Sequence, residues 1–134
     1  MAGTVTYQMQ MRLGNGNLAD SYSTSSLSST QATALLVRNV QVIPFGPGSQ
    51  VALDLGSVTT PGWAVFSNLD VTNYVEVGIV VAATFYPFLR LGPGTASPAV
   101  AGDQSGPIKL SPGVVLYALA NTGAVSLFYI VYNA

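Results

Sequence analysis

The 134-residue sequence contains no histidine and no cysteine, and it carries only four basic and five acidic side chains. Most enzyme mechanisms need a group that exchanges protons near neutral pH, an activated nucleophile or a soft metal ligand. The sequence offers no constellation of this kind, so we predict a protein that is not an enzyme and acts through its surface and shape. The absence of cysteine also excludes a disulfide scaffold.

Charged side chains make up 7% of the chain, whereas about 25% is usual in globular proteins. Because small monomers depend on scattered surface charge for solubility, this composition favours a surface covered by partners, most simply in a homo-oligomer. A monomer with Ser- and Thr-rich faces is the alternative. The net charge of −1, with its few cations dispersed along the chain, gives no basis for nucleic-acid binding.

Two segments bear on location. The first residues lack the basic start and apolar core of a secretory signal, so we expect synthesis in a cytoplasm. Residues 111–134 contain no charge and are long enough to cross a membrane. However, Asn121, Thr122 and Gly123 interrupt this segment, and each half is of strand length. We therefore predict a β-hairpin at 111–134 and no membrane partner.

Alternation of apolar and polar residues predicts β-strands along most of the chain. The clearest case is 4–13, where Val5 and Tyr7 begin an apolar row that alternates with polar residues. We expect the Gly and Asn residues at 14–17 to end this strand in a turn. Further strands are predicted at 35–43, 50–55, 63–69, 74–80, 84–91, 108–110, 114–120 and 124–132.

About eight to ten short strands with regularly spaced turns are typical of an antiparallel β-sandwich, with a jelly-roll or related Greek-key topology. This all-β fold is our prediction, and we expect residues 1–134 to form a single domain. The segment 20–34 is dominated by Ser and Thr. We predict a polar edge strand with a loop there, or alternatively a mobile arm.

Turn residues predict how the strands connect. Residues 60–63, with Pro61 and Gly62 at their centre, fit a Pro-Gly turn with the glycine in the left-handed region. Residues 70–73 predict a hairpin between the strands on either side. Residues 92–106, rich in Gly, Pro, Ala and Ser, are the longest predicted loop.

The strand at 84–91 carries Pro87, which lacks a backbone donor and therefore indicates an edge strand or a bulge. The preceding residues, 80–84, contain almost no polar turn residue. Either this connection is buried in a contact between subunits, or the strands on its two sides are one long strand.

Few side chains could carry chemistry. Asp70 and Glu76 are the one nearby pair of carboxylates, as a glycosidase or a hard metal ion would need. The turn around Asp70 favours a carboxylate that accepts backbone N–H groups, and alternation directs Glu76 to solvent or to an arginine. The seven tyrosines could stack on sugars, but packing or subunit contacts are the favoured role. We predict no catalytic residue, no cofactor-binding residue or cofactor, and no metal ligand.

Three runs carry a family resemblance: TPGWAVFSNLDVTNYVEVG at 60–78, FLRLGPG at 88–94 and LYALANTGAV at 116–125, followed by an apolar strand at 126–132. This half of the chain resembles small virion proteins of tailed bacteriophages. The matching elements are turns and strands, with no catalytic signature among them. The resemblance implies a non-enzymatic structural protein that decorates and cements the outside of a capsid, often as a symmetric trimer.

The expected partners are therefore the major capsid protein or other virion proteins, and the expected location is the virion, after synthesis in the host cytoplasm. Two alternatives stay open. The chain could be a tail, neck or fibre component of the virion, or it could be a carbohydrate-binding module that uses exposed tyrosines and Trp63.

Overall fold

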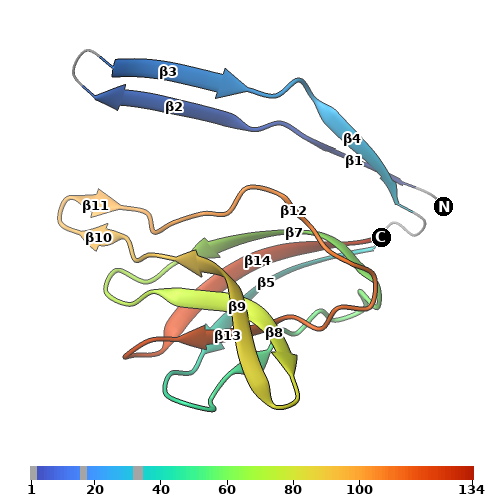
Figure 1. Ribbon diagram of the computed structural model, residues 1–134, viewed down its shortest axis with the longest axis vertical. Helices are drawn as coiled ribbons and strands as arrows, with labels where there is room; N and C mark the ends of the chain where they lie inside the picture. Colours follow the sequence, from blue (N-terminus) through green and yellow to red (C-terminus); the bar gives the residue numbers. More distant parts are fainter. Residues whose placement is uncertain (1–2, 16–17, 32–34) are drawn as a thin grey trace. The chain divides into compact units, whose positions relative to one another are not determined.

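The computed structural model describes residues 3–15, 18–31 and 35–134, and within them it contains strands and no helix (Figure 1). The predicted all-β class is confirmed. The chain divides into two compact units, Met1–Ala34 and Leu35–Ala134, whereas the sequence pattern predicted a single domain over 1–134. In the described residues no helix is long and apolar enough to cross a membrane.

The first unit is an interrupted hairpin. Strand β1 (Gly3–Tyr7) pairs antiparallel with β4 (Leu27–Gln31), and β2 (Gln10–Asn15) pairs with β3 (Leu18–Ser23). Between the two pairs, the Thr24 N–H donates to the Met9 carbonyl at 2.9 Å. The strand predicted at 4–13 is thus split in two.

Two further predictions concern this hairpin. Gly14 and Asn15 belong to β2 and not to the predicted turn, and the other two residues of that prediction, 16–17, lie outside the described residues. The Ser- and Thr-rich segment forms β3 and β4, which agrees with a polar edge strand for 20–31. Residues 32–34 of that segment lie outside the described residues.

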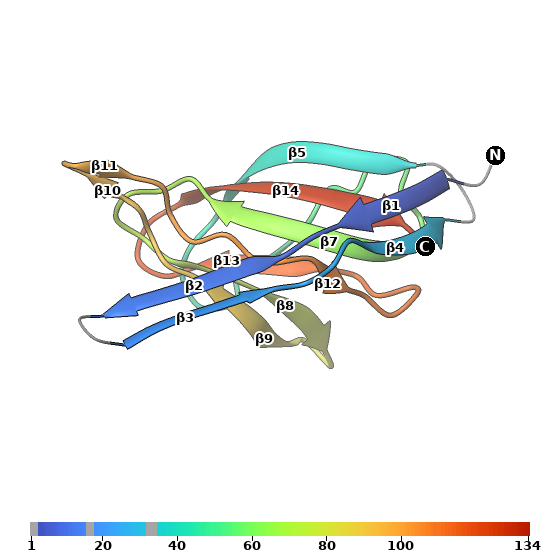
Figure 2. The same ribbon diagram turned by 90° about the horizontal axis from the view of Figure 1, so that it is seen from above.

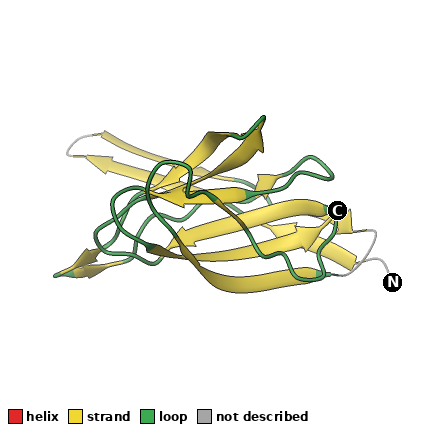
Figure 3. Ribbon diagram, turned by 90° about the horizontal axis from the view of Figure 1, so that it is seen from below, coloured by secondary structure: helices red, strands yellow, loops and turns green. Residues whose placement is uncertain are grey.

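The second unit is a sandwich of two four-stranded antiparallel sheets, which Figures 2 and 3 show as separate layers. The β14 sheet has the order β12 (Ile108–Lys109), β7 (Pro61–Asn68), β14 (Val125–Asn133), β5 (Leu36–Ile43). The β8 sheet has the order β6 (Val51–Ala52), β13 (Tyr117–Ala120), β8 (Val75–Val81), β9 (Thr84–Leu91). Within the predicted loop 92–106, β10 (Thr95–Ala96) and β11 (Ala99–Val100) add a short ribbon.

The core lies between these sheets and follows from strict alternation. Every second side chain of β14 is buried, and the same holds for β13. The largest fully buried side chains are Tyr129, Phe66, Ile43, Leu116 and Leu127. The ring centroids of Phe66 and Tyr129 are 6.5 Å apart, within the usual range for aromatic pairs.

Both hairpins predicted from turn residues in this unit are wrong. The connection at 70–73 leads from β7 in the β14 sheet to β8 in the other sheet, and the connection after β13 leads back to β14. Alternation reports which side chains are buried, but both sheets of a sandwich bury the same kind of face. The pattern therefore could not distinguish a hairpin from a crossing between sheets.

Residues Pro61 and Gly62 were predicted to form a turn, yet they lie in β7. Gly62 is needed there because the backbone of Ala134 approaches closely; an added Cβ would lie 2.6 Å from the Ala134 Cα. This constraint comes from a residue far away in sequence. The local Pro-Gly signal could not show it.

The β8–β9 connection is a tight turn with positive φ at Ala82 (48°) and Ala83 (65°). Two positive φ values fit a type I′ turn, which joins strands despite the missing Gly or Asn. The single long strand considered for this region is therefore wrong. Pro87 was correctly assigned: β9 is an edge strand, and its register shifts between Val77 and Gly78, opposite the proline.

Candidate functional sites: an apolar sheet face and a small cavity

The outer face of the β14 sheet is apolar. Alternation places Phe128, Ile130 and Tyr132 on the side of β14 that points away from the core. Their neighbours across the register include Trp63 and Val65 on β7. Contiguous apolar surface of this kind marks interaction sites more often than scattered single residues do.

Edge strand β5 extends this apolar face with its most exposed side chains. Leu36, Val40 and Val42 are 55%, 53% and 65% exposed. Arg38 shares the face through its register with Ile130. We call the outward side chains of β5, β14 and β7 the apolar face.

The inner side of β5 is polar where it meets the core. The Tyr129 hydroxyl accepts from Asn39 Nδ2 at 3.1 Å and lies 2.9 Å from Gln41 Oε1 and 2.8 Å from the Asp54 carbonyl oxygen. Burial raises the pKa of Tyr129 above its usual value of 10.0, because the low-dielectric surroundings disfavour the phenolate. Between Asn39 and Val42, strand β5 therefore directs polar groups inward and apolar groups outward, whereas Ile43 at its end is buried in the core.

A second candidate site lies on the outer face of the β8 sheet. Val75 and Val77 point into the core, so Glu76 between them points outward. The register places Glu76 opposite Arg90 on β9 and opposite Leu119 on β13. This arrangement agrees with the prediction that Glu76 points to solvent or toward an arginine.

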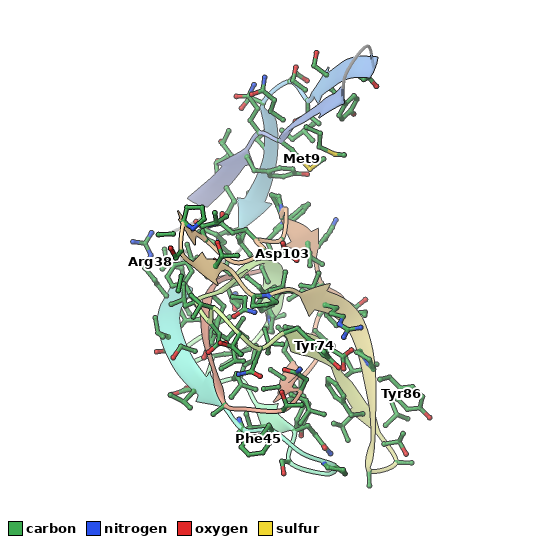
Figure 4. The ribbon with its side chains drawn as sticks, turned by 90° about the vertical axis from the view of Figure 1, so that its left-hand side faces the viewer. Met9, Arg38, Phe45, Tyr74, Tyr86 and Asp103 are labelled. Carbon is green, nitrogen blue, oxygen red and sulfur yellow. The ribbon has the colours of Figure 1, made fainter. Side chains whose placement is uncertain are left out.

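Tyr74 immediately precedes β8 and borders the same site. The Arg90 guanidinium carbon lies 3.5 Å from the centroid of the Tyr74 ring, which is cation–π geometry. The Tyr74 carbonyl accepts the Asn121 N–H at 3.3 Å. Figure 4 shows Tyr74 beside β9, whereas Tyr86 projects away from that strand.

Between these residues and the loop after β5 there is a cavity of about 350 Å³. It is lined by Gly46, Pro47, Tyr74, Glu76, Leu119, Ala120, Asn121 and Thr122. The loop is held against β13 because the Ala120 N–H donates to the Pro44 carbonyl at 3.0 Å. Positive φ values at Gly46 (100°) and Gly48 (75°) let the chain turn there.

One of the residues that line the cavity has a buried side-chain acceptor without a partner. Asn121 Oδ1 is buried and has no hydrogen-bond partner among the described residues. A buried polar atom without a partner costs about 1–3 kcal/mol. Its neighbour Thr122 is already engaged, because its hydroxyl donates to Asn73 Oδ1 at 2.8 Å.

The rim beside the cavity is built by the connection between the two sheets. Asp70 Oδ1 accepts the backbone N–H groups of Thr72 at 2.7 Å and Asn73 at 2.5 Å, as predicted for its turn position. Asp70 is thus occupied as a structural acceptor. Within the described part of the chain, no group of three or more Asp or Glu side chains could hold a metal ion.

Sequence reasoning assigned no site residue and missed this cavity. Its walls come from three separate segments, 46–47, 74–76 and 119–122, which only the sandwich topology brings together. One sequence feature could have indicated this place: alternation directs the charged Glu76 to the outside of the sheet, on a strand whose other alternate side chains are apolar. Comparison with protein-family models, curated proteins and solved structures gives no match for this chain.

Proposed function

We propose that this chain is a non-enzymatic structural protein of a virus particle, and that it decorates the outside of the capsid. It docks on the major capsid protein through the apolar face and stabilises the shell. A role in the tail, neck or fibre of the virion, served by the same face, is the alternative.

The inverted polarity of β5 between Asn39 and Val42 is the observation that carries this proposal. An edge strand that faces water normally exposes polar residues and buries apolar ones. On β5 the exposed side chains include Val40 and Val42, whereas Asn39 and Gln41 bond to the Tyr129 hydroxyl on the inner side. A partner that covers the outer side removes this mismatch.

The charged residues on and beside the apolar face indicate the chemistry of the partner surface. Arg38 lies on this face and Lys109 of β12 lies beside it, across the register from Trp63, and the four strands of the β14 sheet contain no Asp or Glu. A complementary partner surface is apolar at its centre and acidic at its rim. The resemblance of residues 60–133 to small virion proteins of tailed bacteriophages supports a capsid as the source of that surface.

Many copies bound on a symmetric shell would together stabilise that shell. Binding that occurs only in the assembled state stabilises that state by mass action, and linked copies gain further through multivalency. We propose a homotrimer as the docking unit, made in the host cytoplasm and located in the virion.

The experiment compares two lysine substitutions at similarly exposed valines. Val42 lies on the apolar face, and Val115 lies outside every strand, with exposures of 65% and 56%. Particles assembled without the chain are incubated with wild-type protein, V42K or V115K, and bound copies and heat resistance are measured. Wild-type and V115K should bind and restore resistance, whereas V42K should not.

Two outcomes would contradict this proposal. Particles that lack the chain and are as heat-resistant as complete ones would remove the cementing role. Labelled protein found on the tail would contradict capsid decoration and support the alternative role in the tail, neck or fibre. Light scattering over a dilution series tests the oligomer separately, because a monomer at every concentration would contradict the trimer.

A further inference from the structure

Strand β5 is a long and regular edge of the sandwich. Of the four strands that end the two sheets, β6 and β12 have two residues each, whereas β5 and β9 have eight. Strand β9 carries Pro87 and a register shift, and both features keep other chains from pairing with an edge. Strand β5 has no proline, and its register with β14 runs from Leu36 to Ile43 without a shift. Its edge therefore lacks the protection that the other three edges have.

The backbone groups at this edge can be assigned from the two neighbours of β14. In an antiparallel pair, alternate residues exchange both backbone hydrogen bonds, and the residues between them direct their N–H and C=O groups to the other side. The Asn133 N–H donates to the Leu35 carbonyl at 3.0 Å, in register with β5. The Ser126 carbonyl accepts the N–H of Leu69, the residue after β7, at 3.0 Å. Odd-numbered residues of β14 therefore bond to β5, and even-numbered ones bond to β7.

The same register identifies the residues of β5 whose backbone groups are at its free edge. Odd-numbered residues of β14 lie opposite odd-numbered residues of β5, as in the pair of Tyr129 and Asn39. The N–H and C=O groups of Arg38, Val40 and Val42 therefore point away from β14, and no strand of the described residues pairs with that side of β5. The inward-facing Asn39 is half-buried, whereas the inward side chains of β14 are buried. The edge is thus open to solvent.

We propose that an extended segment of the capsid protein pairs with this edge as an antiparallel fifth strand of the β14 sheet. Strand addition of this kind obtains affinity from main-chain hydrogen bonds and specificity from alternate side chains. It places the segment beside the outward side chains of β5, so one partner engages the apolar face and the free backbone groups together. This mode of binding depends on the proposed docking to a capsid, and it specifies the form of the segment that binds.

The side chains of β5 indicate those of the added strand. Directly opposite residues on one face of an antiparallel pair contact each other, and opposite charges there are favourable. The segment should therefore carry an acidic residue opposite Arg38, apolar residues opposite Val40 and Val42, and no proline between them. A second copy of β5 would bring no acidic residue. Pairing of β5 with itself is also a two-fold contact, which builds a dimer and not the proposed trimer.

Hydrogen exchange of backbone amides tests the pairing directly. In the free protein, the amides of Arg38, Val40 and Val42 should exchange about tenfold or more faster than those of the odd-numbered residues between them, because only the latter bond to β14. The protein is then exchanged while bound to particles assembled without the chain, quenched, released and read by NMR. On the particle, the amides of Arg38, Val40 and Val42 should slow about tenfold or more.

Two substitutions at Val40 separate the backbone from the side chain. Val40→Pro keeps an apolar side chain of similar size but removes the N–H at the free edge, where sheets tolerate proline. Val40→Ala keeps this N–H and removes most of the apolar side chain. Val40→Pro should weaken binding to the particles about tenfold or more, because the added strand loses a hydrogen bond and meets the proline ring. Val40→Ala should weaken it only about threefold.

Three results would overturn this inference: slow exchange of the Val40 amide already in the free protein, unchanged exchange of that amide on the particle, or a greater loss of binding with Val40→Ala than with Val40→Pro. The exchange measurement uses the wild-type chain, so it decides the inference even where Val40→Pro does not fold.

Failure of strand addition is distinguishable from failure of the proposed docking. If the apolar face docks without an added strand, V42K prevents binding while Val40→Pro does not. If the docking itself is wrong, the wild-type protein does not bind the particles, and both proposals are refuted.

Discussion

The hairpin of residues 3–31 and the sandwich of residues 35–134 are built from the same kind of alternating strand, yet they differ in what the alternation encloses. In the sandwich, sixteen hydrophobic residues form a buried core. In the described part of the hairpin the buried side chain is a polar one, Gln31, while Met11 and Tyr22 are 61% and 58% exposed. A two-stranded hairpin is marginal by itself in water. Strand pattern gives local structure, and only a second sheet over the first gives a core.

The sandwich also buries polar groups that the hairpin does not need. Asn68 is 1% exposed and serves the crossing between the sheets. Tyr129 is fully buried and ties β14 to the inner side of β5. These groups make the sandwich sensitive to single-atom changes.

The largest effect is expected from Asn68→Asp. Asn68 Nδ2 lies 2.9, 3.1 and 3.0 Å from the carbonyl oxygens of Asn73, Leu91 and Gly92. A carboxylate oxygen in this place would face three acceptors, so the free energy of unfolding should fall by about 3 kcal/mol or more. Chemical denaturation followed by circular dichroism measures the loss.

The matched control is Gln10→Glu, the same amide-to-acid change at an exposed position of β2 in the hairpin. It should alter stability by no more than about 0.5 kcal/mol, as is usual for surface substitutions. An Asn68→Asp protein that unfolds at the wild-type denaturant concentration would show that the crossing contributes nothing to the sandwich.

A smaller loss is expected from Gly78→Ala at the bulge opposite Pro87. The added methyl would collide with the Tyr86 carbonyl oxygen and lie 2.7 Å from the Pro87 Cα, so β9 would have to move. We expect a loss of about 2–3 kcal/mol from this overpacking. Gly113→Ala separates collision from backbone strain, because Gly113 has φ +79° but open space around it. It should cost only about 1 kcal/mol, and equal losses would refute the collision.

Tyr129→Phe should cost about 1–2 kcal/mol, since it leaves the buried partners of the hydroxyl without their bond. The pKa of Tyr129 is raised by burial, so the unfolded chain loses this proton at lower pH than the folded one. The hydroxyl's contribution is therefore complete below pH 10 and declines as pH rises from there toward the raised pKa. Unfolding curves of both proteins across this range should converge; a constant difference would contradict the assignment.

Sequence alone predicted most of the strands and the burial of their faces, because alternation is a local property. It correctly gave Asp70 a turn role and Pro87 an edge position for the same reason. It failed at 70–73 and 121–124, where the chain crosses between sheets, since the partner of a strand depends on distant residues. The cavity was missed on the same grounds: Gly46, Tyr74 and Asn121 meet only after the sandwich has formed.

The smallest effect is expected from removing residues 1–34. The sandwich keeps its core, and Leu35, whose carbonyl accepts the Asn133 N–H at 3.0 Å, is retained. The shortened chain should unfold cooperatively within about 0.5 kcal/mol of the full-length protein, the range expected when no buried feature of the sandwich is lost. A peptide of residues 1–34 should show no cooperative transition, because it lacks a second sheet to cover its apolar row. If the shortened chain were instead much less stable, the hairpin would have to contribute to the sandwich, and the two units could no longer be treated as independent.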